Sequence, residues 1–299
     1  MTSSRILALL ELADECPSED ELAGFLNDPD PDVRRTALSV LSEATEDWTI
    51  SSPIFARALD DTDESVREQA VDLLGELREV LVAGPEFAQA LRDAAAHPEA
   101  VIRVAAIGAL WRHRLCLVPE LSRWLRDPEP QVRGEVVLGL VSLDALDLLG
   151  QAATDTSSAV RLAAARGIAA VGDPRGTATL IALAGDPELL VRAAALSGMS
   201  QTGCSTEAAL IAQAALGESA WQVRQGAANA LSAADPGESA HALIGAANDD
   251  NLDVRKAAIK ALGSWLPARP ELRAVLEAAQ NDLDADVRAY ARMSLHPNP

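Results

Sequence analysis

The sequence predicts an all-α fold, an α-solenoid (superhelix) of about nine stacked helix pairs. A seven-residue phrase that ends in Val-Arg or Ile-Arg recurs nine times, and successive copies lie 28 to 36 residues apart. Such spacing is typical of stacked supersecondary units and not of a closed globular domain. Val and Ile recur at helical spacing, so strands are not expected. The phrase arginines are Arg34, Arg67, Arg103, Arg133, Arg161, Arg192, Arg224, Arg255 and Arg288.

The two ends of the chain are expected to close the stack. A capping helix is predicted over residues 3–13, within a cap of residues 1–15, because the terminal units of a solenoid need a polar outer face that contacts solvent. The repeats follow over residues 19–295, and the last phrase with its helix, residues 282–295, closes the far end together with the tail, residues 296–299. No linker interrupts this series, so the sequence predicts one domain over residues 1–299.

Each phrase leads into a helix with a regular buried face. When the Val or Ile before the phrase arginine is counted as position 0, position +4 is Ala in eight copies and Val136 in the other. Position +8 is Leu in seven copies, and Ile168 and Met199 in the other two. These positions share one side of a helix, and the small residue at +4 indicates that a neighbouring helix approaches closely. Each phrase therefore begins the inner helix of a pair.

A short turn precedes each inner helix. The phrase begins with Asp in seven copies and with His97 and Glu218 in the other two. Pro29 and Pro128 end the preceding helix, whereas Pro31 is suited to the first turn of the next one. The partner helices are expected upstream of the turns, for example over residues 85–96, 119–126, 206–216 and 271–280.

These features resemble the HEAT repeat family, most closely the short HEAT-like repeats of phycobilin lyases. The resemblance is carried by Asp-Pro-Asp-Pro-Asp-Val-Arg at 28–34 and Asp-Pro-Glu-Pro-Gln-Val-Arg at 127–133, each followed by the small residue at +4. It spans nearly the whole chain. The resemblance implies that the inner helices line a concave surface and that phrase Asp and Arg residues form a hydrogen-bonded ladder between adjacent units.

The ladder implied by the resemblance has two irregular places. His97 and Glu218 stand where the other phrases have Asp, so the sequence does not establish whether the third and seventh rungs form. The alternative role of the arginines is to form a row that binds anions. Each arginine, however, has an acidic residue with which it can pair. The ladder residues are Asp28, Arg34, Asp61, Arg67, Asp127, Arg133, Asp155, Arg161, Asp186, Arg192, Asp249, Arg255, Asp282 and Arg288.

The net charge of −20 favours some partners and disfavours others. It would repel nucleic acid and anionic membrane and attract a basic protein, although solubility alone also explains it. The nine phrases hold 19 of the 45 acidic residues, so one long edge of the solenoid is expected to be acidic. The only lysines, Lys256 and Lys260, indicate a bacterial-like composition bias. The sequence carries no signal of oligomeric state.

The cysteine pattern and the hydropathy pattern favour a cytoplasmic protein. Cys16, Cys116 and Cys204 lie far apart and form no Cys-x-x-Cys pair, which disfavours a disulfide framework or a zinc site. No apolar run of about 18 residues is present, and no export signal is recognisable.

No metal, cofactor or catalytic site is predicted. Asp28-x-Asp30-x-Asp32 resembles the start of a calcium loop, but the Gly and Glu that such a loop needs are replaced by Val33 and Ser39. Acidic residues that cap a helix are the alternative interpretation. His113 and Cys116 could share a metal or form a thiolate pair, yet no further ligand lies nearby in the sequence, and no catalytic motif is present.

The predicted partner-binding groove comes from positions +2, +3 and +6 of the inner helices. In the first two repeats these positions are polar, in repeats three to six they are mostly apolar with two opposite charges, and polar side chains return at Gln225, Asn229, Lys256 and Lys260. An apolar patch with a polar rim would hold a helix or an extended peptide. The alternative is a tighter curvature that buries these residues. The groove residues are Val104, Gly108, Trp111, Gly134, Glu135, Leu138, Leu162, Arg166 and Ser197.

Two hypotheses of function follow. The first is a non-catalytic interaction scaffold or adaptor that holds a protein or peptide segment on its concave surface, in a specific version as an immunity-type protein that neutralises a basic partner. The second, from the resemblance alone, is an accessory lyase-like protein that binds a tetrapyrrole and delivers it to a client protein. A DNA-repair enzyme is disfavoured, because 25 basic against 45 acidic residues do not supply a basic channel.

Overall fold

Nineteen α-helices, joined by turns and three short 3-10 helices, make up the computed structural model, which describes residues 2–13, 15 and 17–296. These residues include no strand, so the predicted all-α solenoid class is confirmed. The helices comprise an N-terminal helix and nine pairs, as the phrase count predicted. They fall into two compact units, Met1–Gly139 and Leu140–Pro299, with the boundary inside one helix. One uninterrupted domain over residues 1–299 stays a prediction.

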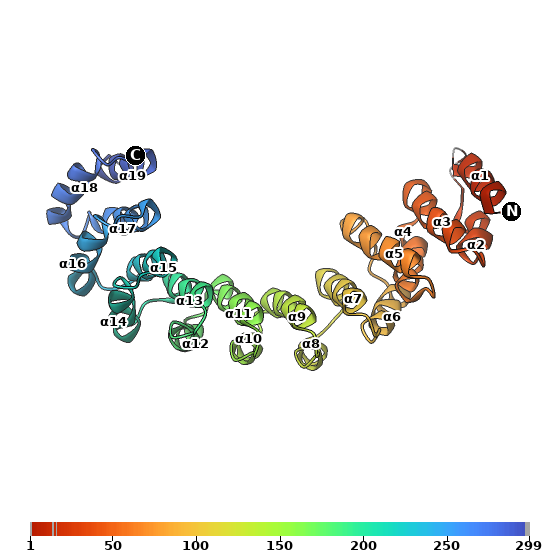
Figure 1. Cartoon of the computed structure of the whole chain (residues 1–299), viewed down its shortest axis with the longest axis horizontal. Coiled ribbons are helices and arrows are strands. Elements are labelled where there is room, and N and C mark those ends of the chain that lie inside the picture. The colour runs from red at the N-terminus through yellow and green to blue at the C-terminus, as the bar shows by residue number, and fades with distance from the viewer. Residues whose placement is uncertain (1, 14, 16, 297–299) are drawn as a thin grey trace. The chain divides into compact units, whose positions relative to one another are not determined.

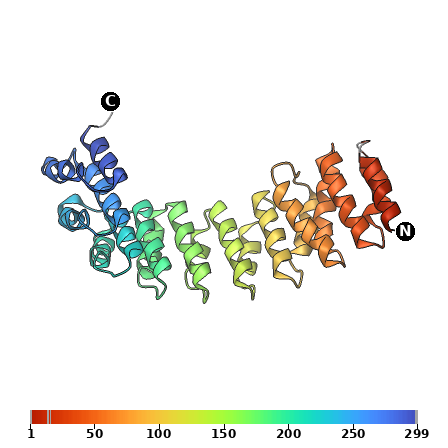
Figure 2. The same ribbon diagram turned by 45° about the horizontal axis from the view of Figure 1, so that its top comes forward.

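The first unit consists of two helix layers. We call a helix that carries a phrase arginine an arginine helix and the helix before it a partner helix. The arginine helices follow α1 in one layer, and the partner helices form the other (Figures 1 and 2). The layer of α1 (Thr2–Ala13) continues with α3 (Pro31–Ala44), α5 (Glu64–Glu76), α7 (Ala100–Arg112) and α9 (Pro130–Ser142), which crosses the boundary. The partner helices are α2 (Glu19–Leu26), α4 (Trp48–Arg57), α6 (Pro85–Ala94) and α8 (Val118–Trp124).

The second unit repeats the same two layers. Its arginine helices pack side by side in chain order, each against its own partner helix (Figure 1). They are α11 (Ser158–Val171), α13 (Leu189–Thr202), α15 (Trp221–Leu231), α17 (Leu252–Trp265) and α19 (Ala285–Leu295). The partner helices are α10 (Leu146–Ala152), α12 (Thr177–Leu183), α14 (Thr206–Ala215), α16 (Pro236–Ala246) and α18 (Arg273–Ala279).

The predicted helix bounds agree with the observed ones to within a few residues. The expected partner helix over 206–216 is α14, and the expected helix over 271–280 is α18 preceded by the 3-10 helix Pro270–Leu272. The expected capping helix over residues 3–13 is α1. Met1 and Asp14 of the predicted cap and residues 297–299 of the tail lie outside the described residues.

The core of each unit is formed by the repeated positions of the arginine helices. Every residue at position 0 and at position +4 is buried, and no residue at +4 has measurable exposure. Small side chains there allow close contact between neighbouring arginine helices. The backbones of α13 and α15 approach closely, since a Cβ on Gly226 would lie 2.5 Å from the carbonyl oxygen of Ala193. Glycine is therefore the residue that this approach permits.

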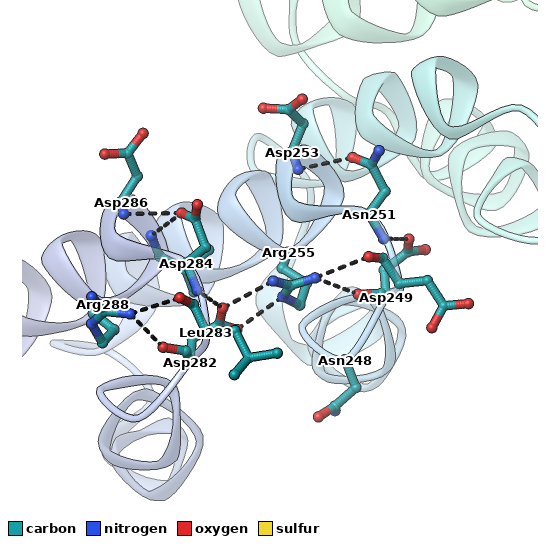
Figure 3. A network of polar contacts seen from close by, with 12 residues as sticks. Asn248, Asp249, Asn251, Asp253, Arg255, Asp282, Leu283, Asp284, Asp286 and Arg288 are labelled. Atoms are coloured by element: carbon teal, nitrogen blue, oxygen red, sulfur yellow. Dashed lines mark hydrogen bonds and ion pairs between the residues drawn. The ribbon is translucent and has the colours of Figure 1, made fainter.

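Arginine–aspartate contacts join successive repeats. In Arg103, Nε and Nη2 donate to the two carboxylate oxygens of Asp127 at 2.8 Å, and Nη1 donates to the carbonyl of His97 at 2.9 Å. The arginine thus bonds to the turn of its own repeat and to the acid of the next. Figure 3 shows the equivalent contacts of Arg255 in the second unit. The two-bond rungs that follow this pattern are Arg34–Asp61, Arg103–Asp127, Arg161–Asp186, Arg224–Asp249 and Arg255–Asp282.

The same carboxylates also organise the turns. Asp282 accepts a hydrogen bond from the backbone N–H of Asp284 at 2.8 Å, and Asp284 caps α19 by accepting from the N–H groups of Asp286 and Val287 (Figure 3). Hydrogen bonds from the Arg255 side chain, with a smaller contribution from its charge, hold the pKa of Asp282 below its usual value, because they favour the carboxylate. Asp282 is thus an ion-pair partner and a turn-forming residue at once.

Three rungs depart from the pattern. Arg5 on α1 pairs with Asp28, so the capping helix supplies an arginine although it has no phrase. Arg67 pairs with Glu99 in place of His97, whose Nδ1 accepts the N–H of Glu99 at 3.1 Å.

The seventh phrase gives the other irregular rung. Arg192 reaches Glu218 through Nη2 at 3.3 Å. The buried Nε atoms of Arg67 and Arg192, like that of Arg5, have no hydrogen-bond partner among the described residues. The two repeats that lack the first Asp therefore have rungs with one side-chain bond to the acid.

We predict that Arg103→Met lowers the free energy of unfolding by about 3 kcal/mol, because it leaves Asp127 buried without its counter-charge. The matched control is Arg288→Met. Arg288 bonds to the carbonyls of Asp282 and Leu283, and to no acid among the described residues. Urea denaturation of both variants checks this, and equal losses would contradict it.

We predict that Glu218→Asp raises the free energy of unfolding by about 1 kcal/mol, because the shorter side chain matches the two-bond geometry and gives Arg192 Nε an acceptor. Thermal denaturation measures the change. The reverse substitution, Asp249→Glu, is the control and is expected to destabilise; a gain in both variants would show that side-chain length is not the cause.

Candidate functional site

The predicted groove residues divide between the two units. In the first unit, Val104, Gly108 and Trp111 lie on α7, and Gly134, Glu135 and Leu138 lie on α9. In the second unit, Leu162 and Arg166 lie on α11, and Ser197 lies on α13. The candidate site is therefore described as one surface in each unit.

In the first unit, α7 and α9 are linked by a cluster of Trp111, Arg112 and Glu135. The indole Nε1 of Trp111 donates to Glu135 Oε1 at 2.8 Å, and Arg112 Nη2 lies 3.1 Å from the same oxygen. The guanidinium carbon of Arg112 lies 4.5 Å from the centre of the Trp111 ring, a cation–π contact. Glu135 is thus a paired charge that fixes the orientation of the tryptophan.

Gly108 makes room for this cluster. A Cβ at position 108 would lie 2.3 Å from Arg112 Nη1 and 2.9 Å from Glu135 Oε1. Arg112 was not among the residues predicted for the groove. Its only signal in the sequence is its place in the last turn of the helix that contains Trp111, so its contact with Glu135 could be found only from the packing of α7 on α9.

The first surface is open to solvent at some of its apolar positions. Leu138 is 45% exposed, Val104 and Trp111 are partly exposed, and Gly108 is buried. Next to them, α5 and α7 enclose a crevice of about 260 Å³ with mostly aliphatic walls. Its lining includes Val71, Leu74, Val101, Val104, Ala105, Ala109, Arg78, Arg112, His113 and Glu135. The surface combines aliphatic walls with a rim of charged side chains.

The second surface is more polar. A hollow of about 370 Å³ lies across α11, α13 and α15, and Arg166 and Ser197 are among its lining residues. Leu162 and Ser197 are partly exposed, and Arg166 is exposed. The side-chain amides of Gln201, Gln222, Gln225 and Asn229 also line the hollow. Uncharged polar groups and one cation thus replace the aliphatic walls of the first surface.

His113 and Cys116 have structural surroundings. His113 is the C-cap residue that follows α7, and its ring contacts that of Phe87 edge to face, with ring centres 5.5 Å apart. Burial, with a smaller contribution from Arg112, lowers the pKa of His113 below its usual value. Burial also raises the pKa of the Cys116 thiol to about 11, so it is protonated at neutral pH and a poor nucleophile.

The acidic motif at residues 28–32 supports the capping interpretation. Asp28 accepts the N–H of Asp30 at 2.8 Å, and Asp30 accepts the N–H of Asp32 at 3.1 Å. Across residues 2–13, 15 and 17–296, no three or more His, Cys, Asp or Glu side chains are grouped to hold a metal ion. Cys16 lies outside this range. None of the helices in it has the length and apolar character needed to cross a membrane.

The repeat geometry defines the class of protein. A family model described as HEAT repeats matches residues 19–111, 118–200, 146–232 and 208–296. The chain belongs to the HEAT repeat family. Stacked repeats of this kind form extended surfaces that typically bind other proteins.

Two solved structures extend the comparison of folds. An engineered protein has a TM-score of 0.56 and 17% identity, over 99% of this chain and 95% of that one. Importin beta has a TM-score of 0.63 and 14% identity, over 93% of this chain and 44% of that one, so this chain spans less than half of it. At these identities the similarity is one of fold. A search of curated proteins gives no match.

Proposed function

We propose that this chain is a non-catalytic protein-interaction scaffold that binds a protein segment on the exposed faces of its arginine helices. The observation that supports this most is the first surface, where the exposed Leu138 lies on the helix that positions the half-buried Trp111. An apolar surface with a charged rim fits a protein partner better than it fits a small polar substrate.

The state of Trp111 supports this proposal. Its indole N–H bonds to Glu135 and Arg112 lies against its ring, so its orientation is fixed before a partner arrives. A side chain that is already ordered loses little conformational entropy on binding. Tryptophan and arginine are also enriched among the residues that contribute most to protein interfaces. Trp111 and Arg112 are therefore the proposed anchor of the first surface.

A basic partner is the finer form of the proposal. The chain has a net charge of −20, and its nine phrases hold 19 of the 45 acidic residues. An exposed acid such as Glu64, at the start of α5, lies outside the arginine rungs and extends the negative charge beyond the neutralised pairs. An edge of this kind attracts a basic protein surface. An immunity-type protein that neutralises a basic partner in the cytoplasm is the specific version of this proposal, whereas delivery of a tetrapyrrole stays an untested prediction.

We predict that Leu138→Asp removes binding of the native partner, because it places a charge in the apolar surface. The measurement is affinity capture from the cell of origin, with the bound proteins quantified for the wild type and for each variant. Leu210→Asp is the matched control, since Leu210 is 61% exposed on the partner helix α14. The proposal fails if the partners of the wild type remain bound to Leu138→Asp, or if Leu210→Asp loses them equally.

We predict that binding of a captured partner weakens about tenfold or more when the salt concentration rises from 50 to 300 mM, because salt screens an acidic edge from a basic surface. Isothermal titration calorimetry at three salt concentrations measures this. Affinity that is independent of salt would contradict the basic character of the partner and would leave the apolar surface as the source of affinity.

A further inference from the structure

One face of the second unit has a charge opposite to that of the chain. Positions +2 and +6 of α11, α13, α15 and α17 carry no acidic residue and three cationic ones. On α5 in the first unit, the same positions are Glu68 and Asp72. The eight residues are Leu162, Arg166, Ala193, Ser197, Gln225, Asn229, Lys256 and Lys260, and both lysines of the chain are among them.

Two of these cations are available for a ligand. Arg166 and Lys260 are exposed, and neither makes a hydrogen bond or an ion pair with another residue that the structure describes. Lys256 differs from them, because it lies 3.4 Å from Asp253 and 3.3 Å from Asp286. In a chain with 45 acidic residues, two unpaired cations in one row leave a local positive charge at each end of it.

The row between the two cations consists of polar, uncharged groups. Position +6 holds Arg166, Ser197, Asn229 and Lys260 on four consecutive arginine helices. The side-chain amide of Asn229 donates one N–H to Ser197 Oγ at 3.1 Å. Its side-chain oxygen and its second side-chain N–H remain available.

Two more amides line the same hollow. The side chains of Gln222 and Gln225 are partly exposed and make no hydrogen bond within the described chain. A side-chain amide offers donor and acceptor together, as the backbone of an extended peptide requires. A bound helix would have no use for these groups, because its own backbone is already paired.

Small residues in the lining of the hollow allow a main chain to come close to these amides. They are Ala193, Ala194 and Gly226. No aromatic side chain is among the lining residues, which disfavours a single-stranded nucleic acid, since its bases need stacking partners. The net charge of −20 disfavours it further.

We propose that this surface of the second unit, the amide groove, binds an extended protein segment with acidic residues near both of its ends. The proposal rests on the scaffold function and names the chemistry of one bound segment. Three helix spacings of about 9 Å separate Arg166 from Lys260, or about 27 Å. An extended segment of about eight residues spans that length. This acidic segment is distinct from the basic partner surface that is proposed to dock on the acidic edge formed by the phrases.

The net charge of the chain does not prevent this binding. Salt screens exposed charges over about 8 Å at physiological ionic strength, so the nearest unpaired groups dominate. A carboxylate that reaches Arg166 also gains charge-assisted hydrogen bonds, which are stronger than those between neutral groups. The local chemistry of the groove therefore decides which segment it accepts.

The test uses the full chain and an eight-residue peptide with blocked ends, Asp-Asp-Ser-Ala-Ala-Ser-Asp-Asp, labelled for fluorescence anisotropy. The comparison peptide has Lys in place of each Asp. The acidic peptide is expected to bind about tenfold or more tightly than the lysine peptide, in spite of the net charge of the protein. Neither peptide binding, or equal binding of both, would overturn the proposal.

The variants locate the binding. Arg166→Glu and Lys260→Glu are each expected to weaken binding of the acidic peptide about tenfold, and Gln225→Leu about threefold through loss of its hydrogen bonds. Arg273→Glu is the matched control, an exposed arginine on α18 without an ion pair to any described residue, and its effect is expected to stay within about twofold. An equal effect of Arg273→Glu would show that the peptide is held by nonspecific electrostatic attraction and not at a defined site, and it would overturn the proposal.

Two further measurements keep the outcome decisive. Circular dichroism verifies that each variant keeps its helix content, and Arg166→Gln replaces Arg166→Glu if the latter does not fold. An eight-nucleotide single strand is a competitor, and the proposal is overturned if it binds more tightly than the acidic peptide. A failure here with Leu138-dependent capture intact would reject the acidic segment alone, whereas loss of both would reject the scaffold function.

Discussion

The arginine rung is the contact on which the order of the repeats depends. Each two-bond arginine holds the carbonyl that opens its own turn and the carboxylate that opens the next, so one side chain sets the distance between two turns. A largely buried ion pair is tolerated only when its hydrogen-bonding groups are satisfied. This requirement explains why the phrase has a fixed length: the acid and the arginine must stay six residues apart for both contacts to form.

The sequence predicted the helix pairs well because their signals are local. The small residue at +4, the acid that opens the turn and the proline after it each act within a few residues, so their positions could be assigned directly. The pairings of Arg5 and Glu99 could not be predicted in the same way. Arg5 belongs to a helix without a phrase, and Glu99 substitutes for the acid missing at position 97 because turn geometry brings it within reach.

The sequence predicted which positions form the candidate surfaces, but it did not predict which of their charged side chains are paired. The inner-helix positions that carry Leu138 and Arg166 followed from helix periodicity, and the structure places both at the surface. The pairing of Glu135 with Trp111 and Arg112 depends on the shift between two neighbouring helix axes. Likewise, whether an acidic side chain lies within reach of Arg166 or Lys260 depends on the side-chain rotamers of several neighbouring helices. Such relations arise only once the chain has folded.

The one-bond rungs of Arg67 and Arg192 have a mechanical consequence. A stack of repeats under tension transmits the load from each repeat to the next, and the joint with the fewest cross-links extends first. Among the described residues, the first unit contains two such joints, Arg5–Asp28 and Arg67–Glu99, and the second contains Arg192–Glu218. Within each unit, a pull along the stack would therefore separate neighbouring repeats at these joints before any single helix unwinds.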